Sequence, residues 1–158
     1  MKEIQLTQGK TAVIDDEDFQ LISKWKWRVV KKKSDQTCYA MRRTKENGKH
    51  IAVTMHRAIM NPPKGAPIDH IDGDGLNNRR SNLRVCTHAQ NCWNRKHNSN
   101  AKNRFKGVYK KGTRWESFIT TNRQKVYLGS FETDLEAALA YNIAATKYFG
   151  DFAKLNIV

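Results

Sequence analysis

The sequence contains few acidic residues and no long hydrophobic segment. Asp and Glu together number 15, against 29 Lys and Arg, so the 158 residues carry a formal net charge of +14. No apolar run approaches the roughly 20 residues that are needed to span a bilayer, which argues against a membrane-spanning protein. The N-terminal segment has neither the apolar region nor the cleavage site of a secretion signal. We therefore expect a cytoplasmic protein, in the cytosol or at the nucleoid of its host cell.

Cysteine is also scarce. The sequence holds Cys38, Cys86 and Cys92, an odd set at wide spacing, whereas a disulfide framework in a secreted protein favours an even number. A structural zinc site would need four Cys or His ligands in close pairs, and Cys86 and Cys92 do not form such a pair. We therefore expect three reduced thiols, as is usual in a cytosol.

The excess of positive charge favours a polyanionic partner, and nucleic acid is the commonest one. The densest basic stretch runs from Arg95 to Arg114 and contains no acidic residue. A charge run of this kind can also be a solvated face or a flexible linker. Within it, residues 97–104 are rich in Asn and Ser, which favour turns, and we predict a basic linker there.

Residues 1–54 are predicted to be rich in β-strands. A Gly-centred turn separates two short apolar pieces in QLTQGKTAVI, and a short helix is expected from Asp15. The segments WKWRVV, TCYAMRR and HIAVTM alternate as strands do, and Asn47-Gly48 predicts a hairpin turn between the last two. Basic residues lie among these strands: Lys24, Lys26, Arg28, Lys31, Lys32, Lys33, Arg42 and Arg43. The region is either a plain antiparallel sheet with polar side chains outward or a sheet that also contacts a phosphate backbone.

Residues 105–158 are predicted to form three strands followed by a helix. The strands are expected at residues 106–110, 114–120 and 124–128. Thr133, with Glu136 three residues later, forms the capping box that starts a helix, and Gly150 is expected to end it in a left-handed conformation. The apolar side of this helix is predicted to comprise Leu135, Ala138, Tyr141, Ala145 and Tyr148.

The segment between these regions is unusually rich in Asp, Asn and His. Asp69 and His70 end an extended piece, a turn-rich loop follows, and residues 83–86 are predicted to form a second short strand. A helix is expected to begin at His88. A strand, loop, strand and helix in this order would place Asp69, His70 and the helical Asn91 around one cleft.

The pattern D-H-x-D-G-D-x-x-N-N-R-x-x-N-L-R, followed by a short helix containing Q-N, resembles the ββα-metal nucleases of the HNH class, specifically the homing endonucleases of phages and introns. Several spaced polar positions match together over residues 55–95. The resemblance implies that His70 is the general base that deprotonates the attacking water, as the near-neutral pKa of imidazole allows. It also implies that the side-chain oxygen of Asn82 accepts a hydrogen bond from the His70 ring and so fixes its tautomer.

The same resemblance implies that Asp69 and Asn91 are the protein ligands of one divalent cation. The third letter of the motif is Asn here rather than His. Oxygen ligands suit a hard ion, so Mg²⁺ or Mn²⁺ is expected and a tight zinc site is not. The metal would neutralise the scissile phosphate, and the expected products carry a 5′ phosphate and a 3′ hydroxyl.

Other polar side chains of this segment have less specific expectations. Arg79, Arg80 and Arg84 are either phosphate contacts, which a planar guanidinium suits, or contributions to solubility. Asp72 is expected either to accept backbone hydrogen bonds in the loop or to stand on the metal side. The remaining expectations are that Asn77 and Asn78 form the loop and that His56 packs or caps.

Residues 105–156 resemble the Apetala-type DNA-binding domain of plant ethylene-response factors. The matching pieces are Lys106-Gly107-Val108-Tyr109, Arg114-Trp115, Tyr127-Leu128-Gly129-Ser130-Phe131, Glu136-Ala137-Ala138, Ala140-Tyr141, Ala144-Ala145, Gly150 and Ala153-Lys154-Leu155-Asn156. In that family a three-stranded sheet enters the major groove of duplex DNA and the helix supports it. The implied DNA contacts, with those of the basic stretch, are Arg95, Lys96, Arg104, Lys106, Tyr109, Lys111, Arg114, Lys125 and Tyr127. Because Phe118 and Thr120 replace charged positions of the family, its base preference is not transferred.

The sequence thus predicts an α+β protein with three parts. These are a β-rich, DNA-contacting region at residues 1–54, an HNH nuclease core at 55–96 and, after the linker, an Apetala-type domain of a three-stranded sheet on one helix at 105–158. We expect a metal-dependent, homing-type endonuclease that nicks or cuts double-stranded DNA. A monomer is expected because one active site and no dimerisation stripe are visible. The rival hypotheses are a non-catalytic DNA-binding regulator on an HNH scaffold and an RNA-binding protein.

Overall fold

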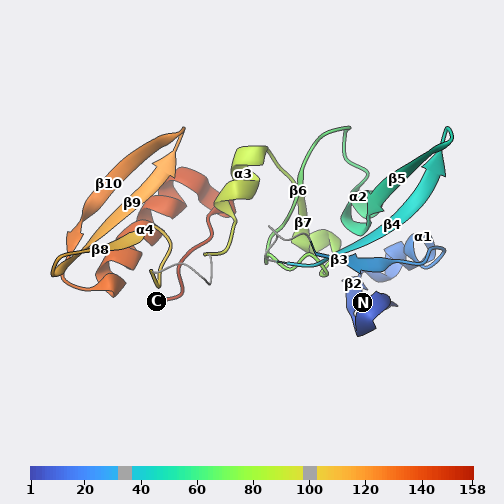
Figure 1. Cartoon of the computed structure of the whole chain (residues 1–158), viewed down its shortest axis with the longest axis horizontal. Helices are drawn as coiled ribbons and strands as arrows, with labels where there is room; N and C mark the ends of the chain where they lie inside the picture. The colour runs from blue at the N-terminus through green and yellow to red at the C-terminus, as the bar shows by residue number, and fades with distance from the viewer. Residues whose placement is uncertain (32–36, 98–102) are drawn as a thin grey trace. The chain divides into compact units, whose positions relative to one another are not determined.

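The computed structural model describes residues 1–31, 37–97 and 103–158 (Figure 1). The chain packs as two compact units, residues 1–91 and 92–158. Both contain strands and helices, so the predicted α+β class is confirmed. Lys32, Lys33 and most of the predicted linker lie outside the described residues. Within the described part of the chain, no helix is long and apolar enough to cross a membrane.

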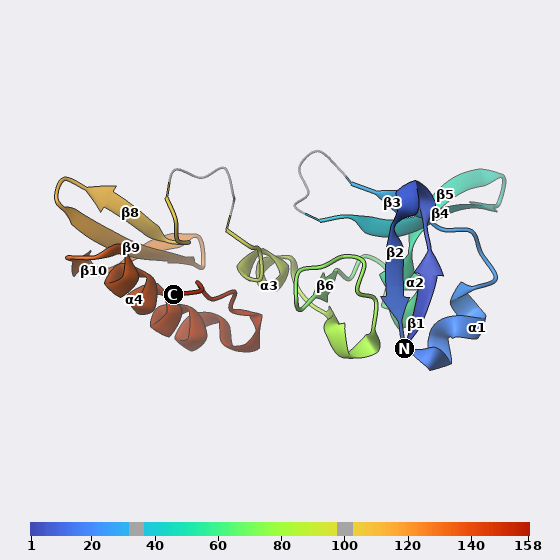
Figure 2. The same cartoon turned by 90° about the horizontal axis from the view of Figure 1, so that it is seen from below.

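Unit 1 begins with the short hairpin that the Gly-centred turn predicted. Strand β1 (Lys2–Gln5), the 3-10 turn η1 (Thr7–Gly9) and strand β2 (Thr11–Ile14) form it, and the two strands pair antiparallel (Figure 2). The short helix expected next is present as a 3-10 turn, η2 (Asp16–Asp18), that continues into α1 (Phe19–Ile22). The acidic side chains in this first turn interact favourably with the positive end of the helix dipole.

A three-stranded antiparallel sheet follows, in the order β3-β4-β5. Its strands are β3 (Arg28–Val30), β4 (Tyr39–Glu46) and β5 (Lys49–Thr54). The predicted turn Asn47-Gly48 joins the last two, and both residues have positive φ angles, 47° and 77°, as a tight hairpin requires. Helix α2 (Met55–Met60) begins directly after β5. The sequence pattern had not predicted it.

The predicted strand, loop, strand and helix are present at the end of unit 1. Strand β6 (Ile68–His70) pairs antiparallel with β7 (Leu83–Val85), and a single 3-10 turn, η3 (Arg80–Asn82), leads into β7. Helix α3 (His88–Trp93) follows. It is capped by Thr87, whose hydroxyl accepts a hydrogen bond from a backbone N–H of the first turn, at 3.2 Å.

One hydrophobic core serves the whole of unit 1. It includes Ile14 and Trp27 from the predicted N-terminal region together with Met55, Ile59 and Leu83 from the predicted nuclease core. These apolar side chains form a single cluster. The expected domain boundary at residue 54 stays a prediction, and it falls within a segment whose two sides share this core.

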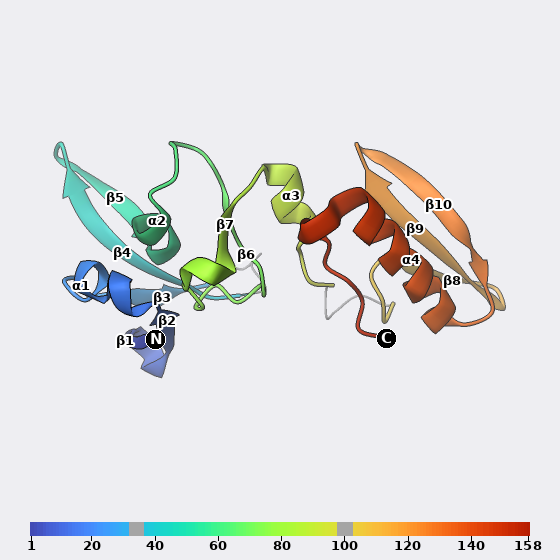
Figure 3. The same ribbon diagram turned by 180° about the vertical axis from the view of Figure 1, so that it is seen from behind.

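Unit 2 consists of a three-stranded antiparallel sheet and one long helix, as predicted. The strands are β8 (Val108–Lys111), β9 (Arg114–Thr121) and β10 (Gln124–Phe131), in the order β10-β9-β8. Helix α4 (Asp134–Phe149) lies along one face of this sheet and runs into a 3-10 turn, η4 (Gly150–Phe152) (Figure 3). None of the helices in the described part of the chain covers the other face of the sheet.

Helix α4 starts at the predicted capping box: the Thr133 hydroxyl accepts from the Glu136 backbone N–H, and the Glu136 carboxylate accepts from the Thr133 N–H. Its buried side differs from the prediction, because Leu135 and Tyr148 are exposed. The buried residues are Ala137, Ala138, Tyr141, Ala144, Ala145 and Phe149. The alanines let the helix lie close to the sheet, which turns the buried arc away from Leu135.

Gly150 follows α4 with the positive φ that was expected, 53°. Its ψ of −131° lies outside the left-handed helical region, so the predicted left-handed cap is wrong in detail. The backbone N–H of Gly150 donates to the Thr146 carbonyl, and η4 begins at the same residue.

Candidate active site

The β6-β7 ladder places the predicted metal ligand Asp69 directly opposite Arg84. Arg84 Nε and Nη2 lie 2.9 Å and 2.7 Å from the same carboxylate oxygen, Oδ2 of Asp69. Asp69 is buried and the Arg84 side chain is largely so. Arg84 was expected to contact phosphate or solvent, whereas in the structure it neutralises and orients the Asp69 carboxylate.

His70, the predicted general base, is the last residue of β6 and is only 6% exposed. Its Nε2 lies 3.4 Å from Oδ1 of Asn78, a residue with no exposed surface. The Asn78 side-chain amide donates to the Leu76 carbonyl at 3.1 Å, which directs its Oδ1 toward the ring. Since a carbonyl oxygen only accepts, Nε2 carries the proton and Nδ1 is the unprotonated nitrogen of the neutral ring.

Two aromatic side chains pack against the His70 ring. The His56 ring, from α2, meets it edge-on with centroids 5.0 Å apart, and the Tyr39 ring, at the start of β4, lies 5.9 Å from both. Nε2 of His56 lies 2.9 Å from the Thr54 hydroxyl. The prediction that His56 packs or caps is confirmed as packing, and its partner is the catalytic candidate. We call His56 and Tyr39 the ring pair.

Burial keeps both imidazoles neutral. It lowers the pKa of His56 to about 3, helped by the nearby His70 and Arg57. Burial also lowers the pKa of His70, although the contact with Asn78 and the charges of nearby carboxylates oppose this. At neutral pH the His70 ring is therefore ready to accept a proton.

Asp72 organises the loop that follows His70. Its carboxylate accepts from the backbone N–H of Asp74 (2.7 Å) and from the side-chain amides of Asn77 (2.8 Å) and Asn82 (2.9 Å). Burial opposes the charged form of Asp72, but these hydrogen bonds lower its pKa. The expectation that Asp72 holds the loop is confirmed.

Asn82 is bound to this loop. Its Oδ1 accepts from the Asp72 N–H at 3.0 Å, and its amide also donates to the Asn77 carbonyl at 2.8 Å. The ring contact expected of Asn82 is made by Asn78, so the structure gives His70 a different amide neighbour. Both asparagines lie in the same asparagine-rich loop. No local feature of the sequence indicates which of the two side chains points toward the His70 ring.

The loop is pressed against the rest of unit 1. The backbones of Leu76 and Asn78 bond to Val13 of β2, at 2.9 Å and 2.8 Å. A side chain at Gly75 would meet the Cys38 carbonyl at 2.4 Å and the Tyr39 ring at 2.6 Å. Only glycine fits there, so the loop, the ring pair and β2 together fix the position of His70.

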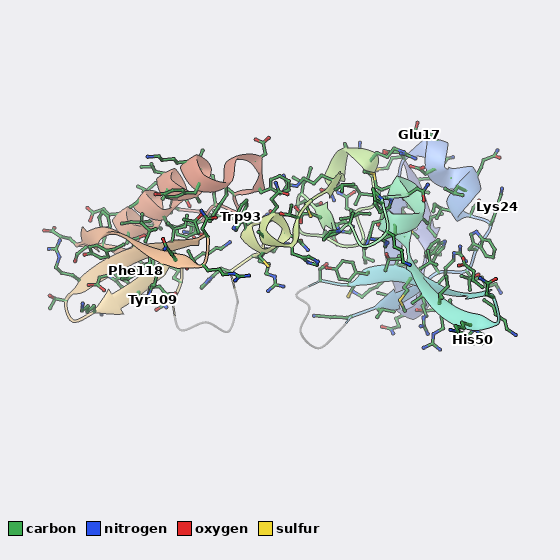
Figure 4. The ribbon with its side chains drawn as sticks, turned by 90° about the horizontal axis from the view of Figure 1, so that it is seen from above. Glu17, Lys24, His50, Trp93, Tyr109 and Phe118 are labelled. Carbon is green, nitrogen blue, oxygen red and sulfur yellow. The ribbon has the colours of Figure 1, made fainter. Side chains whose placement is uncertain are left out.

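Arg79 and Arg80, the other predicted phosphate contacts, are paired with η2 and with Asp15 directly before it. Arg80 makes a bidentate contact with the Asp18 carboxylate, through Nη2 at 2.7 Å and Nε at 3.0 Å. The Arg80 Nε also lies 2.8 Å from a carboxylate oxygen of Glu17, which is labelled in Figure 4. Arg79 Nε lies 3.2 Å from Asp15. Hydrogen bonding to Asp18 raises the pKa of Arg80 above its ordinary value. Arg80 therefore has a structural role in the fold.

Replacing Arg80 with alanine should destabilise unit 1. Asp18 is 2% exposed, and its charge would stay buried without its partner. We expect a loss of about 2 kcal/mol, between the values typical of exposed and of buried ion pairs. Urea unfolding measures it. Arg79→Ala is the matched control, because the Arg79 pair is more exposed and should contribute well under about 1 kcal/mol. Equal effects of the two substitutions would contradict this role of Arg80.

The expected metal ligands supply oxygen atoms only. Asp69 is the middle residue of β6, and Asn91 is half-buried on α3, where its backbone N–H donates to the Thr87 carbonyl at 3.0 Å. Among the described residues there is no cluster of three or more His, Cys, Asp or Glu side chains that could hold a metal ion. A carboxylate and an amide oxygen fit an ion that keeps water and substrate phosphate as its other ligands, as Mg²⁺ does. They do not fit structural zinc.

Lys106, a predicted DNA contact, is bound inside unit 2. Its ammonium group donates to the backbone carbonyls of Trp93 (2.8 Å) and Arg95 (3.0 Å). Its own backbone is held by the Asn156 side chain, at 2.8 Å and 3.1 Å. Burial lowers the pKa of Lys106 to about 8. The structure thus gives this side chain an internal role in place of the expected DNA contact.

The face of the unit 2 sheet that α4 leaves open carries Tyr109, Phe118 and Tyr127, one from each strand, and the first two are labelled in Figure 4. Neighbouring ring centroids lie 5.9 Å and 5.3 Å apart. The Lys125 ammonium lies 3.9 Å from the centre of the Phe118 ring. Tyr109 and Tyr127 are 44% and 54% exposed. We call these four residues the aromatic face, and it brings together three of the predicted DNA contacts.

The remaining predicted contacts stay at the surface. Lys111 lies 2.9 Å from Glu116, and this hydrogen bond raises the pKa of Lys111. The Arg114 guanidinium donates to the hydroxyl and carbonyl of Ser130, at 3.0 Å and 2.9 Å. Arg95, Lys96 and Arg104 are also exposed, and Arg104 lies 3.9 Å from Asp134. Their positive charges remain available to an anionic partner.

Comparison with known proteins identifies the segment that forms this site. Residues 59–92 match the HNH endonuclease family, and the match contains Asp69, His70, Asn82 and Asn91. Over 150 residues, 94% of the chain, the sequence is 29% identical to an HNH endonuclease of Acanthamoeba polyphaga mimivirus, of which it covers 76%.

Part of the chain is also similar to parts of plant transcription factors. An AP2-like ethylene-responsive transcription factor of Arabidopsis thaliana is 45% identical over 56 residues, which are 34% of this chain and 12% of that protein. An ethylene-responsive transcription factor of Medicago truncatula is 34% identical over 86 residues, 52% of this chain and 32% of that protein. These partial matches support the resemblance to the Apetala-type domain without establishing it. The comparisons are clearest for the central segment, residues 59–92, which matches an HNH endonuclease domain.

Proposed function

We propose that the chain is a metal-dependent endonuclease of the homing type, which hydrolyses phosphodiester bonds of double-stranded DNA inside the host cell. The observation that carries the proposal is the state of His70: a buried, neutral imidazole at the end of β6, adjacent to Asp69. A general base must be unprotonated and held in a fixed direction. Burial keeps the ring unprotonated, and the contact with Asn78 and the packing of the ring pair fix its direction.

In the proposed reaction, His70 Nδ1 takes a proton from water as the water oxygen attacks the scissile phosphorus. The bond from phosphorus to the 3′ oxygen breaks and the leaving oxygen takes a proton from solvent water, which gives a 5′ phosphate and a 3′ hydroxyl. Arg84 holds the Asp69 carboxylate in place throughout. A divalent cation held by Asp69 and Asn91 would supply charge neutralisation at the phosphate and at the leaving oxygen.

Target binding is assigned to the aromatic face and the surface cations beside it. A sheet of this width can enter the major groove, where base edges are distinguishable. Tyr109, Phe118 and Tyr127 offer apolar contact to bases, and Lys125 together with Arg114 offers positive charge to phosphates. The exposed Arg43 on the β3-β4-β5 sheet is proposed as a further phosphate contact.

The test is cleavage of supercoiled plasmid by the purified chain with Mg²⁺, Mn²⁺ or EDTA. Mg²⁺ and Mn²⁺ should convert the plasmid to open circles or linear DNA, and EDTA should stop the conversion, because the phosphate charge would then stay uncompensated. A pool of random sequences in the plasmid ensures that a target is present. A gel shift of the same DNA without any cutting would favour the rival proposal of a non-catalytic regulator. Cleavage that persists in EDTA would contradict the metal dependence.

A further inference from the structure

Helix α4 is apolar on its outer side as well as on the side that packs on the sheet. Leu135, Leu139 and Ile143 follow one another at four-residue spacing and are 43%, 48% and 73% exposed. Residues four apart lie on the same side of a helix, so these three form one line, which we call the outer stripe. A helix that is apolar all round is normally buried all round. The outer stripe is therefore unusual for a surface helix.

Opposite charges lie at the two ends of the outer stripe. Glu136 is in the first turn of α4 and Lys147 in the last, and both are exposed. At 3.6 residues per turn, Glu136, Ile143 and Lys147 lie within about 40° of one another around the helix axis. After Leu135, the outer side of α4 therefore carries the acid Glu136, then Leu139 and Ile143, then the base Lys147.

We propose that the outer stripe is the contact surface for a second copy of this chain, with the two α4 helices antiparallel about a two-fold axis. The axis passes between Leu139 and Ile143. Leu139 then packs on Ile143 of the partner subunit, and Glu136 faces Lys147 of the partner subunit. Both contacts occur twice, since a two-fold interface is self-complementary.

The charges at Glu136 and Lys147 determine which partner covers the outer stripe and in which relative direction the two helices lie. A parallel pair would set each Glu136 against its copy and each Lys147 against its copy, and like charges in contact repel. A nucleic acid would not bind this surface favourably, because its phosphates would meet apolar side chains and the Glu136 carboxylate. The α4 helix of a second copy, in the antiparallel direction, supplies both the apolar residues and the opposite charges.

The pair is weak and depends on concentration. Three apolar side chains per copy make a small surface compared with the roughly 800 Å² that each partner contributes to a stable interface. The proposal itself does not depend on nuclease activity. If the proposed function also holds, a pair of chains carries two HNH sites, one for each strand of a duplex.

Sedimentation velocity of the full chain without DNA, over a series of concentrations, tests the proposal. The wild type should sediment faster as concentration rises. Leu139→Glu and Ile143→Glu should each raise the dimer Kd at least tenfold, because each puts two carboxylates into the apolar contact. Leu21→Glu is the matched control, since Leu21 on α1 is 45% exposed, close to Leu139, and lies outside the stripe. It should leave the Kd unchanged.

A charge exchange tests the direction of the pair. Lys147→Glu and Glu136→Lys should each weaken self-association, because each variant faces like charges with its own copy. An equimolar mixture of the two should associate again, since the mixed pair has opposite charges at both ends. Far-UV circular dichroism checks that α4 survives the loss of its capping carboxylate. A wild type that stays monomeric at every concentration, or an Ile143→Glu variant that associates like the wild type, would overturn the proposal.

Discussion

Replacing His70 with alanine is expected to lower the rate of DNA cleavage by about 10²–10⁴, the range that a positioned general base contributes. DNA affinity should change little, because the predicted contacts with bases and phosphates lie on the sheets and not at His70. Single-turnover cleavage at saturating enzyme measures the first quantity, and a gel shift in EDTA measures the second. Loss of cleavage with retained binding separates catalysis from folding.

His50→Ala is the matched control for this experiment. His50 is exposed near the tip of the β4-β5 hairpin (Figure 4), whereas His70 is buried. Its removal should leave the cleavage rate within about twofold, a change that corresponds to under roughly 0.5 kcal/mol. A His70→Ala enzyme that cuts as fast as wild type would show that another group takes the proton, and the proposed mechanism would fail.

DNA affinity is expected to fall by about 10³–10⁵ between 50 and 200 mM salt, the loss that six to ten phosphate contacts produce. The net charge of +14 supplies enough cations even after the internally bound ones are set aside. Arg80, Arg84 and Lys106 are occupied by carboxylates or carbonyls. Arg95, Lys96, Arg104 and the cations of the sheets remain. Fluorescence anisotropy with a labelled duplex measures the dependence.

Two substitutions, Lys125→Ala and Lys106→Ala, test the salt dependence of DNA binding at single residues. Lys125 lies on the aromatic face, so its loss should weaken binding and reduce the slope of log affinity against log salt by about 1. Lys106 donates to backbone carbonyls, so its loss should lower the stability of unit 2 and leave that slope unchanged. An affinity that does not vary with salt would contradict the electrostatic basis of DNA binding.

The elements that local signals specify were predictable from the sequence. Asn47-Gly48 demands a tight hairpin, Thr133 and Glu136 demand a helix start, and the alternating strands on either side followed from their residue types. The HNH pattern placed Asp69 and His70 on a strand before a loop, as the structure has them. Each of these signals acts within a few residues.

The neighbours of His70 were not predictable in this way. Tyr39, His56 and Asn78 reach the ring from β4, α2 and the loop, and only the folding of unit 1 brings them together. Helix α2 itself has six residues and no side-chain cap, so its sequence carries little helical signal. Its position follows from the burial of Met55 and Ile59 in the shared core.

Charge counts also could not tell which cations face solvent. Arg80 and Asp18 are 62 positions apart in the sequence, and their pairing depends on tertiary structure alone. The same holds for the outer side of α4. The predicted stripe assumed one apolar side, whereas the helix has two, and the alanines decide which of them meets the sheet.

The distribution of the hydrophobic cores has a consequence for how such a chain can be recombined. The core of unit 1 draws on residues from Ile4 to Leu83, and the two clusters of unit 2 draw only on residues beyond Asn91. A chimera that joins residues 1–54 to a foreign nuclease segment would lose half of its core and the partners of its acidic turn. A chimera that keeps residues 1–91 whole and exchanges the rest leaves every core intact. We therefore expect that the DNA target can be changed, in evolution or in the laboratory, by exchanging the second unit, whereas exchanging part of the first unit would disrupt its core.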